Sequence, residues 1–387
     1  MQVLDSALKQ VSDRIAAARA DRQALHLRGG GTKDFFGAAP RGELLDTRVL
    51  QGVRSYEPSE LVVTVRSGTP LAELEALLLE KGQCLPFEPP HYAWSAHTAT
   101  GSGATVGGML ATGWSGPARA SVGGVRDYVL GVQMINGLGE HLTFGGQVMK
   151  NVAGYDVSRL MVGAMGTLGL ITEVSLKVLP LAPAEDTLCF ELPQHAALDQ
   201  LHVWGGQPLP LNASCWVRDA TGPGPAREVL YVRLRGAVAA VEAACRSMLL
   251  DQRGQRMDTA QVSADWTLCR NHQLPFFTRP PQPDLVLWRL SLPQTAPVLD
   301  LPWATLVEWQ GALRWVWAPV DAGTQLQALA TKHGGNAMLF VATKANSAWA
   351  TGQFDIKNPA QQAIHARLKA SFDPEGIFNP GRWAPLA

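Results

Sequence analysis

Three consecutive glycines between an arginine and a threonine, Arg28 to Thr32, are the residues of this chain best suited to bind an anion. Glycine has no Cβ, so such a run lets several backbone N–H groups point at one phosphate. Arg28 adds a guanidinium whose donors match phosphate oxygens. The run therefore indicates a phosphate or diphosphate site, although a glycine triplet alone is also typical of a surface turn.

The spacing around this run excludes two common nucleotide-binding loops. The G-x-G-x-x-G pattern that opens directly into a helix is missing, so the run is not a Rossmann fingerprint. No G-K-[ST] closes it, so it is not a Walker A loop. Any nucleotide held here needs a different architecture.

Composition narrows the class of protein. A chain of 387 residues is expected to form two or three compact units. Its 33 Lys and Arg balance 33 Asp and Glu, which removes the electrostatic argument for nucleic acid or an anionic membrane as a partner. The five cysteines, without a C-x-x-C pair, argue against a disulfide framework, a zinc site or an iron–sulfur cluster.

The N-terminal residues predict an amphipathic helix and not a signal peptide. The sequence contains no apolar run of about 18 residues, so it predicts no membrane span. We therefore expect a cytoplasmic protein without a transmembrane segment. Twelve tryptophans are unusual, and six fall between residues 266 and 317. Core packing is the default prediction for these six, with a pocket wall or a subunit interface as alternatives.

The pattern up to residue 182 predicts helices and strands that could position the glycine run. We expect a strand before the run, a strand over 60–68 and a helix over 69–83, with Thr69 as its N-cap and Gly82 as its end. A glycine-rich stretch over 98–124 precedes a predicted hairpin over 128–146. Strict alternation from Ile171 to Leu179 predicts a half-buried strand, and the prolines after it predict a domain boundary at about residue 182.

The later residues predict a second domain. Strands over 227–236, 284–293 and 313–319 alternate with helices over 237–252 and 324–335, which indicates an α+β domain with an antiparallel sheet. The proline-rich stretch 275–283 is predicted to be a loop. The chain then ends with a helix and a tail punctuated by Pro and Gly.

Four motifs, in this order, carry a family resemblance. They are RGGGT, TVGGMLATGWSG from Thr105 to Gly116, KNVAGYD followed by GTLGLITEVSLKVLP, and FDPEGIFNPGR. Together they resemble the vanillyl-alcohol oxidase or PCMH type of FAD-binding protein and, within it, the FAD-binding subunits of glycolate oxidase (glycolate dehydrogenase). The resemblance covers about the first 180 and the last 20 residues.

The resemblance implies an α+β fold with three parts. A two-subdomain PCMH-type FAD-binding domain is expected over residues 1–182, with subdomains at about 20–95 and 96–182. A smaller α+β cap domain with an antiparallel sheet is expected over 183–350. Residues 351–387 are expected to form a helix and a tail that returns to the FAD domain.

The resemblance also implies how FAD is held. The first glycine loop would bind the diphosphate, the second cluster would approach the other side of the cofactor, and the tail would return toward the isoalloxazine. Thr32 stands where some members carry a histidine that attaches FAD, so noncovalent FAD is expected. The predicted FAD-binding residues are Arg28, Gly29, Gly30, Gly31, Thr32, Thr105, Gly107, Gly108, Ser115, Gly116, Arg119, Asp127, Gly166, Thr167, Gly169, Ile171 and Asn379.

Several of these side chains have a structural alternative. Arg119 could stabilise the anionic reduced flavin, or it could brace a loop through a salt bridge. Asp127 and Asp156 could orient loops or accept ribose hydroxyls. His91 could line the cofactor pocket. Gly123, Gly124, Gly137 and Gly139 are predicted to be turn residues rather than ligands.

Catalytic residues are harder to predict. Oxidation of a 2-hydroxy acid needs a cation for the carboxylate, a base for the hydroxyl and a flavin to accept hydride. His272, Arg289 and Arg314 are the candidates, each with packing or solvent exposure as the alternative. Related dehydrogenases often carry a histidine-rich metal site in the cap, but this chain offers only His333 there, so no metal is expected.

The resemblance implies an FAD-binding subunit of a multi-subunit glycolate oxidase. A paralogous FAD subunit and an iron–sulfur subunit would be its partners, and the complex could associate with a membrane. The alternative is an electron-transfer or assembly subunit, with the hydroxy acid oxidised on the paralogue. A nicotinamide-dependent reductase such as UDP-N-acetylenolpyruvoylglucosamine reductase is disfavoured, because KNVAGYD and NPGR are not its marks.

Overall fold

The computed structural model describes residues 5–92, 103–146, 155–221, 224–341 and 358–382. The chain divides into two compact units. The first unit comprises Met1–Trp114, Gly124–Pro180 and Ile356–Ala387, and the second comprises Ser115–Gly123 and Leu181–Asp355. The assignment of residues 115–123 to the second unit was not anticipated from the sequence.

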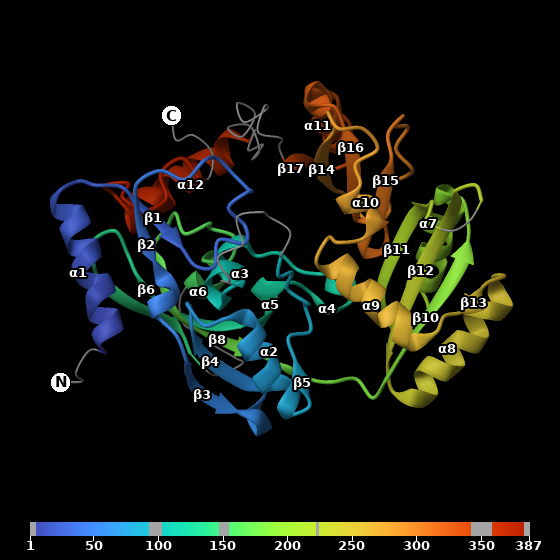
Figure 1. Ribbon diagram of the computed structural model, residues 1–387, viewed down its shortest axis with the longest axis horizontal. Coiled ribbons are helices and arrows are strands. Elements are labelled where there is room, and N and C mark those ends of the chain that lie inside the picture. Colours follow the sequence, from blue (N-terminus) through green and yellow to red (C-terminus); the bar gives the residue numbers. More distant parts are fainter. Residues whose placement is uncertain (1–4, 93–102, 147–154, 222–223, 342–357, 383–387) are drawn as a thin grey trace. The chain divides into compact units, whose positions relative to one another are not determined.

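An antiparallel five-stranded sheet forms the centre of the first unit, with the order β3-β4-β8-β6-β7 (Figure 1). Its hydrophobic core includes side chains of two helices, α2 and α3. The predicted hairpin is confirmed, since β6 pairs antiparallel with β7. The bounds are β3 Val53–Glu57, β4 Val62–Arg66, β8 Leu170–Lys177, β6 Val129–Ile135, β7 His141–Gly145, α2 Leu71–Glu80 and α3 Val106–Thr112.

The central strand β8 differs from its prediction. Its alternating sequence predicted a half-buried strand, yet six of its eight residues are buried. Thr172 and Ser175, on the polar positions, are only 4% and 8% exposed, and their hydroxyls form hydrogen bonds with His141 and Thr64. Both buried hydroxyls are thus satisfied by hydrogen bonds within the protein, which allows polar positions of β8 to be buried.

The N-terminal helix and the C-terminal tail pack together in the first unit. Helix α1 (Ser6–Ala20) buries Val11 and Ile15 in a cluster that contains Leu25 and Phe378. Strand β1 (Leu25–Arg28) pairs parallel with β2 (Glu43–Asp46), and the tail forms a bridge to β1 at Leu25 and Phe378. The C-terminal helix α12 (Pro359–Phe372) precedes this tail.

One helix start was predicted wrongly. Pro70, not Thr69, is the N-cap of α2, and the Thr69 hydroxyl accepts a hydrogen bond from the Gly52 N–H at 2.9 Å. Gly82, at φ +64°, follows the end of the helix as expected. Short elements complete the unit: η1 Thr47–Val49, η2 Pro58–Glu60, β5 Gln83–Cys84, α5 Val125–Tyr128, α6 Val157–Leu160 and β9 Leu179–Pro180.

The second unit is built on an eight-stranded sheet with the order β13-β10-β12-β11-β15-β16-β14-β17. All its strand pairs are antiparallel, which confirms the predicted antiparallel sheet. The strands are β10 Ala184–Glu191, β11 Leu211–Asp219, β12 Arg227–Gly236, β13 Gln255–Arg256, β14 Val286–Ser291, β15 Thr305–Glu308, β16 Leu313–Ala318 and β17 Asn336–Val341.

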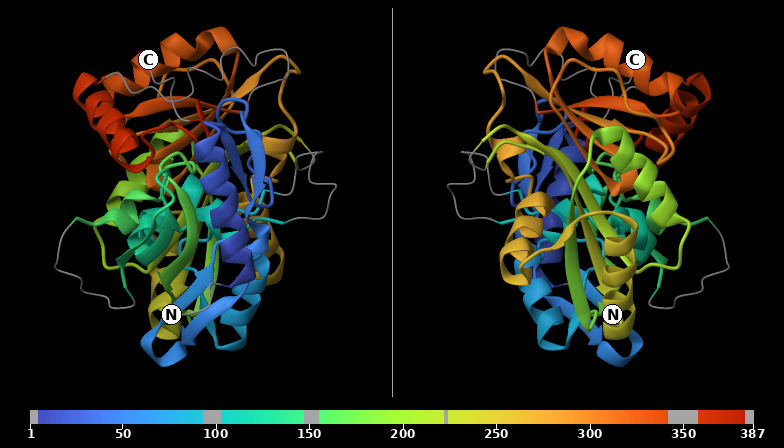
Figure 2. Two further views of the ribbon diagram at one scale, coloured as in Figure 1. Left: turned by 90° about the vertical axis from the view of Figure 1, so that its left-hand side faces the viewer. Right: turned by 90° about the vertical axis from the view of Figure 1, so that its right-hand side faces the viewer.

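Three helices cover one face of this sheet, and a cluster of aromatic side chains lies on the other. Helices α7 and α8 cover one half and α11 the other (Figure 1 and Figure 2). On the opposite face Trp315 packs edge-on against Phe277 and Phe340, with ring centroids 5.5 and 4.7 Å away. The remaining elements are α4 Arg119–Val122, α7 Gln194–Gly205, α8 Val238–Asp251, α9 Thr259–Arg270, α10 Pro275–Thr278, η4 Trp309–Gly311, η5 Val320–Ala322 and α11 Gly323–Lys332.

Two expectations about this unit are resolved. The proline-rich stretch predicted as a loop begins with α10, because Pro275 takes the first helical position. The core prediction is confirmed for five of the six late tryptophans, which are at most 6% exposed: Trp266, Trp288, Trp309, Trp315 and Trp317. All five cysteines of the chain are free thiols.

A buried ion pair fixes the C-terminal segment of the first unit. The Lys369 ammonium lies 2.5 Å from a carboxylate oxygen of Asp373 and donates to the carbonyl of Thr167 at 2.7 Å. The Asp373 carboxylate also accepts from the N–H groups of Ile377 and Phe378. The pair thus holds the FDPEGIFNPGR segment against the GTLG loop.

We expect Asp373→Asn to lower the free energy of unfolding of the first unit by about 3–5 kcal/mol, because the substitution leaves a buried ammonium without its partner. Urea unfolding of the purified chain measures the change. Lys9 and Asp13 form a matched control pair at the same i,i+4 spacing, with both side chains 64% exposed. Asp13→Asn should cost no more than about 0.5 kcal/mol. Equal effects of the two substitutions would contradict this account.

Candidate functional site

A hollow in the first unit lies at the end of β1, where the glycine loop meets α3. It is open to solvent and has about 550 Å³ of empty space, a volume that includes the solvent in its mouth. Met165 and the tail complete its lining. The predicted FAD-binding residues that line it are Arg28, Gly29, Gly30, Gly31, Thr32, Thr105, Gly108 and Asn379.

Close packing explains two of the loop glycines. A Cβ on Gly29 would overlap the hydroxyl of Thr105, and a Cβ on Gly31 would overlap the guanidinium of Arg28. Gly31 also has φ +73°, which other residues rarely adopt. Thr105 is the N-cap of α3 and accepts from the Gly108 N–H at 3.2 Å. The loop therefore lies directly against the start of α3.

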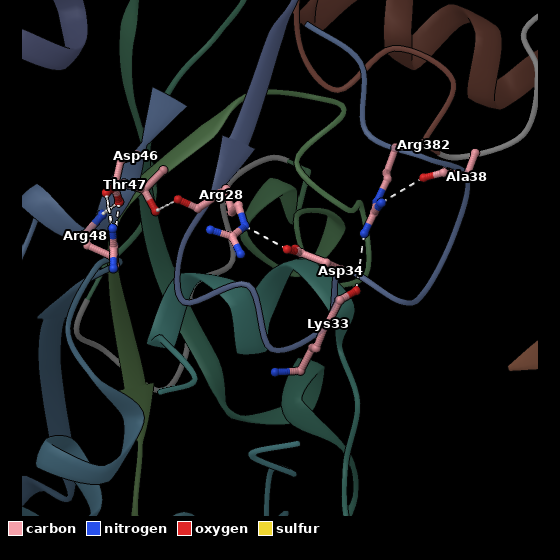
Figure 3. Close-up of polar contacts among 8 residues, drawn as sticks. All are labelled: Arg28, Lys33, Asp34, Ala38, Asp46, Thr47, Arg48 and Arg382. Atoms are coloured by element: carbon pink, nitrogen blue, oxygen red, sulfur yellow. Dashed lines mark hydrogen bonds and ion pairs between the residues drawn. The ribbon is translucent and has the colours of Figure 1, made fainter. Parts of the chain in front are cut away.

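Three cations and one carboxylate surround the loop (Figure 3). The Arg28 guanidinium forms an ion pair with Asp34 at 2.7 Å. Arg382, only 8% exposed, donates to the carbonyl of Ala38 at 2.7 Å, and burial lowers its pKa. With Lys33, these groups leave two net positive charges in the hollow, which suits a diphosphate.

Lys33 is a buried cation whose ammonium has fewer hydrogen bonds than the Arg382 guanidinium, which also forms no ion pair with the described residues. Its residue is 8% exposed, and its ammonium lies 3.4 Å from the Thr32 hydroxyl and 5.6 Å from the centre of the Tyr92 ring. Within the part of the chain that the structure describes, no carboxylate lies within ion-pair distance of it. Burial lowers the pKa of Lys33 from 10.5 to about 8. An anion entering the hollow would supply the missing charge.

Asn379 holds the walls of the hollow together. Its side-chain oxygen accepts from the Leu27 N–H at 2.8 Å, and its side-chain nitrogen donates to the Met165 carbonyl at 2.8 Å. Asn379 and Met165 both have positive φ, 42° and 54°. The predicted role toward the isoalloxazine remains a prediction, and the hydrogen bonds add a structural one.

Other predicted residues pack the scaffold beside the hollow. Gly107 donates to the Ser67 carbonyl at 2.6 Å, and Gly169 lies against Met134 and Ile135. Ile171 belongs to the core of the first unit. Gly166 abuts Asn379, and the Thr167 hydroxyl bonds to the Ala164 carbonyl. Their contacts with FAD stay predictions.

Three predicted residues belong to the second unit. The Gly116 carbonyl, one residue after Ser115, accepts from the Trp309 indole N–H at 3.0 Å. The Arg119 guanidinium lies over the Trp309 ring, 4.6 Å from its centre. A cation–π contact thus occupies Arg119 where a loop-bracing salt bridge was the predicted alternative.

Acidic residues and a histidine near these segments have local roles. Asp127 accepts from the Gly124 N–H at 2.8 Å and so shapes the start of α5. Asp156 caps α6. His91 lies 2.9 Å from the Glu75 carboxylate and is not part of the hollow lining. Of KNVAGYD, only Tyr155 and Asp156 fall within the described residues.

The catalytic candidates take part in packing of the second unit. His272 is 8% exposed and stacks on Phe277 at 4.6 Å, and burial lowers its pKa to about 3, so it stays neutral. Arg314 is 1% exposed and donates to the carbonyls of Ala296 and Pro297 at 2.6 Å each. Arg289 is partly exposed and lies 5.2 Å from the centre of the Trp309 ring.

Sequence reasoning missed Lys33, Asp34 and Arg382. The first two directly follow RGGGT, and Arg382 ends the NPGR motif. A charged pair immediately after a phosphate loop was a usable signal. The burial of Lys33 and Arg382 was not, because it depends on contacts with distant segments.

Comparison with known proteins identifies the family. The model of the FAD binding domain matches residues 6–145. Glycolate oxidase subunit GlcE of Escherichia coli (strain K12) is 42% identical over 375 residues, which is 97% of this chain and 95% of that protein. The chain belongs to the GlcE family of glycolate oxidase subunits. The predicted superfamily, the α+β fold class and FAD as cofactor are thereby confirmed.

Other relatives of this GlcE-family chain match a part of it. D-2-hydroxyglutarate dehydrogenase of Xanthomonas citri pv. viticola is 30% identical over 51% of the chain and 40% of its own length. Mitochondrial D-lactate dehydrogenase (cytochrome) of Arabidopsis thaliana is 33% identical over 36% of the chain and 23% of its own length. These matches support an oxidoreductase, as the resemblance implied.

A solved structure extends the likeness of the fold to nearly the whole chain. Alkyldihydroxyacetonephosphate synthase aligns with a TM-score of 0.64 over 96% of this chain and 75% of its own, at 16% identity. Such low identity concerns the fold alone. Among the described residues, no helix is long and apolar enough to cross a membrane, and no group of three or more His, Cys, Asp or Glu is arranged to hold a metal ion.

We expect Gly29→Ala to weaken FAD binding about tenfold, because the new methyl group displaces Thr105 and overpacking costs about 1–3 kcal/mol. Titration of FAD into the apoprotein measures the change. Gly103→Ala is the control, because a Cβ there meets no atom of the described residues within 4 Å and the backbone is not in the left-handed region. Unchanged affinity in Gly29→Ala would contradict the close approach described above.

Proposed function

We propose that this chain holds FAD noncovalently in the hollow and acts as the FAD-binding subunit of a multi-subunit glycolate oxidase. The observation that carries the proposal is a glycine loop and three cations around one hollow, in a chain with an FAD binding domain. The name of the E. coli relative supports glycolate as the substrate class. Bound FAD would supply a ring that accepts a hydride or electrons.

The residues of the hollow have distinct roles in this proposal. The glycine loop from Arg28 to Thr32 would hold the diphosphate by backbone N–H groups, with Lys33 and Arg382 as counter-charges. Thr105 and Gly108 would shape the opposite wall, and Asn379 would keep the walls in place. The hollow would thus cover one side of the diphosphate and fix its position.

The proposed domains of the chain are those that the family resemblance implies. Residues 1–182 would form the FAD domain, residues 183–350 a cap, and residues 351–387 a returning helix and tail. A paralogous FAD subunit and an iron–sulfur subunit would be the partners, in a complex that is cytoplasmic or associates with a membrane.

A second candidate is an electron-transfer or assembly subunit that oxidises no substrate itself. The structure of the cap supports it, because His272 is buried and neutral and Arg314 is bonded to backbone carbonyls. Neither residue is available as a base or as a carboxylate ligand. The hydroxy acid would then be oxidised on the paralogous subunit.

We expect the purified chain to be yellow, with one FAD per chain that is released into the supernatant when the protein is precipitated with acid. Absorbance of the supernatant and of the pellet measures this. A colourless chain that takes up no added FAD would contradict the proposal, and flavin left in the pellet would contradict noncovalent attachment.

Anaerobic mixing with glycolate distinguishes the two candidates. If the chain oxidises glycolate on its own FAD, the flavin absorbance of the isolated chain decreases after mixing. If it is an electron-transfer or assembly subunit, only the reconstituted complex loses flavin absorbance. Lactate and a non-hydroxylated acid such as acetate serve as comparison substrates.

A further inference from the structure

Lys33 differs from the other two cations of the hollow in its bonding. Arg28 has the Asp34 carboxylate at 2.7 Å, and Arg382 donates to two backbone carbonyls, those of Ala38 and Lys33 itself. Among the described residues, the Lys33 ammonium has a single hydrogen-bond partner, the Thr32 hydroxyl at 3.4 Å, which is a weak contact. A buried ammonium with so little compensation needs an anion or loses its proton.

We propose that the Lys33 side chain is a counter-ion of the FAD diphosphate and takes up a proton from solvent when FAD binds. The inference rests on the proposed function, since it assumes that FAD occupies this hollow. The step balances, because a neutral amine and one proton form the ammonium that faces the diphosphate. Lys33 thus positions the cofactor and takes no part in oxidation.

The charges around Lys33 favour this exchange. Arg382 and Arg28 are like charges, and the Asp34 carboxylate is already paired with Arg28. His26 also lines the hollow, and burial lowers its pKa, so it adds no charge at alkaline pH. Tyr92 presents its ring, and its contacts with Phe35 and Trp114, at 5.7 and 5.2 Å between ring centroids, keep that side apolar. The described residues therefore offer Lys33 no anion, whereas FAD brings two negative charges.

The affinity for FAD is expected to fall as the pH rises. In the apoprotein the Lys33 pKa is about 8, and the diphosphate raises it again. A group whose pKa is higher in the complex binds a proton on association, so affinity falls as pH rises above the pKa of the free site. Between pH 7 and pH 9 we expect the Kd for FAD to increase about tenfold, with nearly one proton taken up per FAD at pH 9.

The test uses the full-length apoprotein, titrated with FAD at pH 7 and pH 9. Calorimetry in two buffers of different ionisation enthalpy counts the protons. Wild type should show the tenfold change and proton uptake. Lys33→Gln should bind FAD more weakly at pH 7, with less than a twofold change between the two pH values and no proton uptake. Lys81→Gln, at an exposed lysine of the same unit, should behave as wild type.

Lys33→Arg covers the case in which the glutamine variant fails to fold. A guanidinium stays charged at pH 9, so this variant should bind FAD equally well at both pH values. Wild-type pH dependence and proton uptake in either variant would overturn the inference and leave FAD binding intact. An apoprotein that binds FAD at neither pH would instead overturn the proposed function.

Discussion

The side-chain amide of Asn379 is the contact on which the hollow of the first unit depends. It connects the backbone of β1, just before the glycine loop, with the loop at Met165, which lies far away in sequence. The same tail residue also donates its N–H to Leu25, so the tail continues beside β1. Three separate stretches of chain are thereby held at one place, and Arg382, three residues further on, donates to the carbonyl of Lys33, directly after the glycine loop.

The Lys369–Asp373 pair explains why two motifs far apart in sequence act as one structure. The ammonium contacts the carbonyl of Thr167 in GTLG, and the carboxylate receives two N–H groups of the FDPEGIFNPGR segment. The ion pair is buried and fully hydrogen-bonded only when the GTLG motif and the FDPEGIFNPGR motif lie together. The tail is therefore part of the first unit, although residues 181–355 separate it in sequence from the rest of that unit.

Local patterns predicted much of the fold. Helical periodicity located α2, α8, α11 and α12, and alternation located β4, β12, β14 and β16. Alternation did not reveal how much of β8 is buried, because its buried hydroxyls bond to residues of other strands, Thr64 on β4 and His141 on β7. Alternation also could not predict what surrounds Arg314 and Trp315, which are adjacent on β16 and point to opposite faces of the sheet. Only the packed structure shows that Arg314 binds loop carbonyls while Trp315 packs with His272.

Residues 115–123 belong to the second unit although they lie between two stretches of the first unit in sequence. The chain passes between its two units at four places, after Trp114, Gly123, Pro180 and Asp355. A fragment cut at residues 181 and 355 would lack the carbonyl of Gly116 that binds the Trp309 indole. Residues 181–355 alone are therefore not the whole of the second unit. An exchange of that unit for a related one keeps the contact between Gly116 and Trp309 only if residues 115–123 move with it.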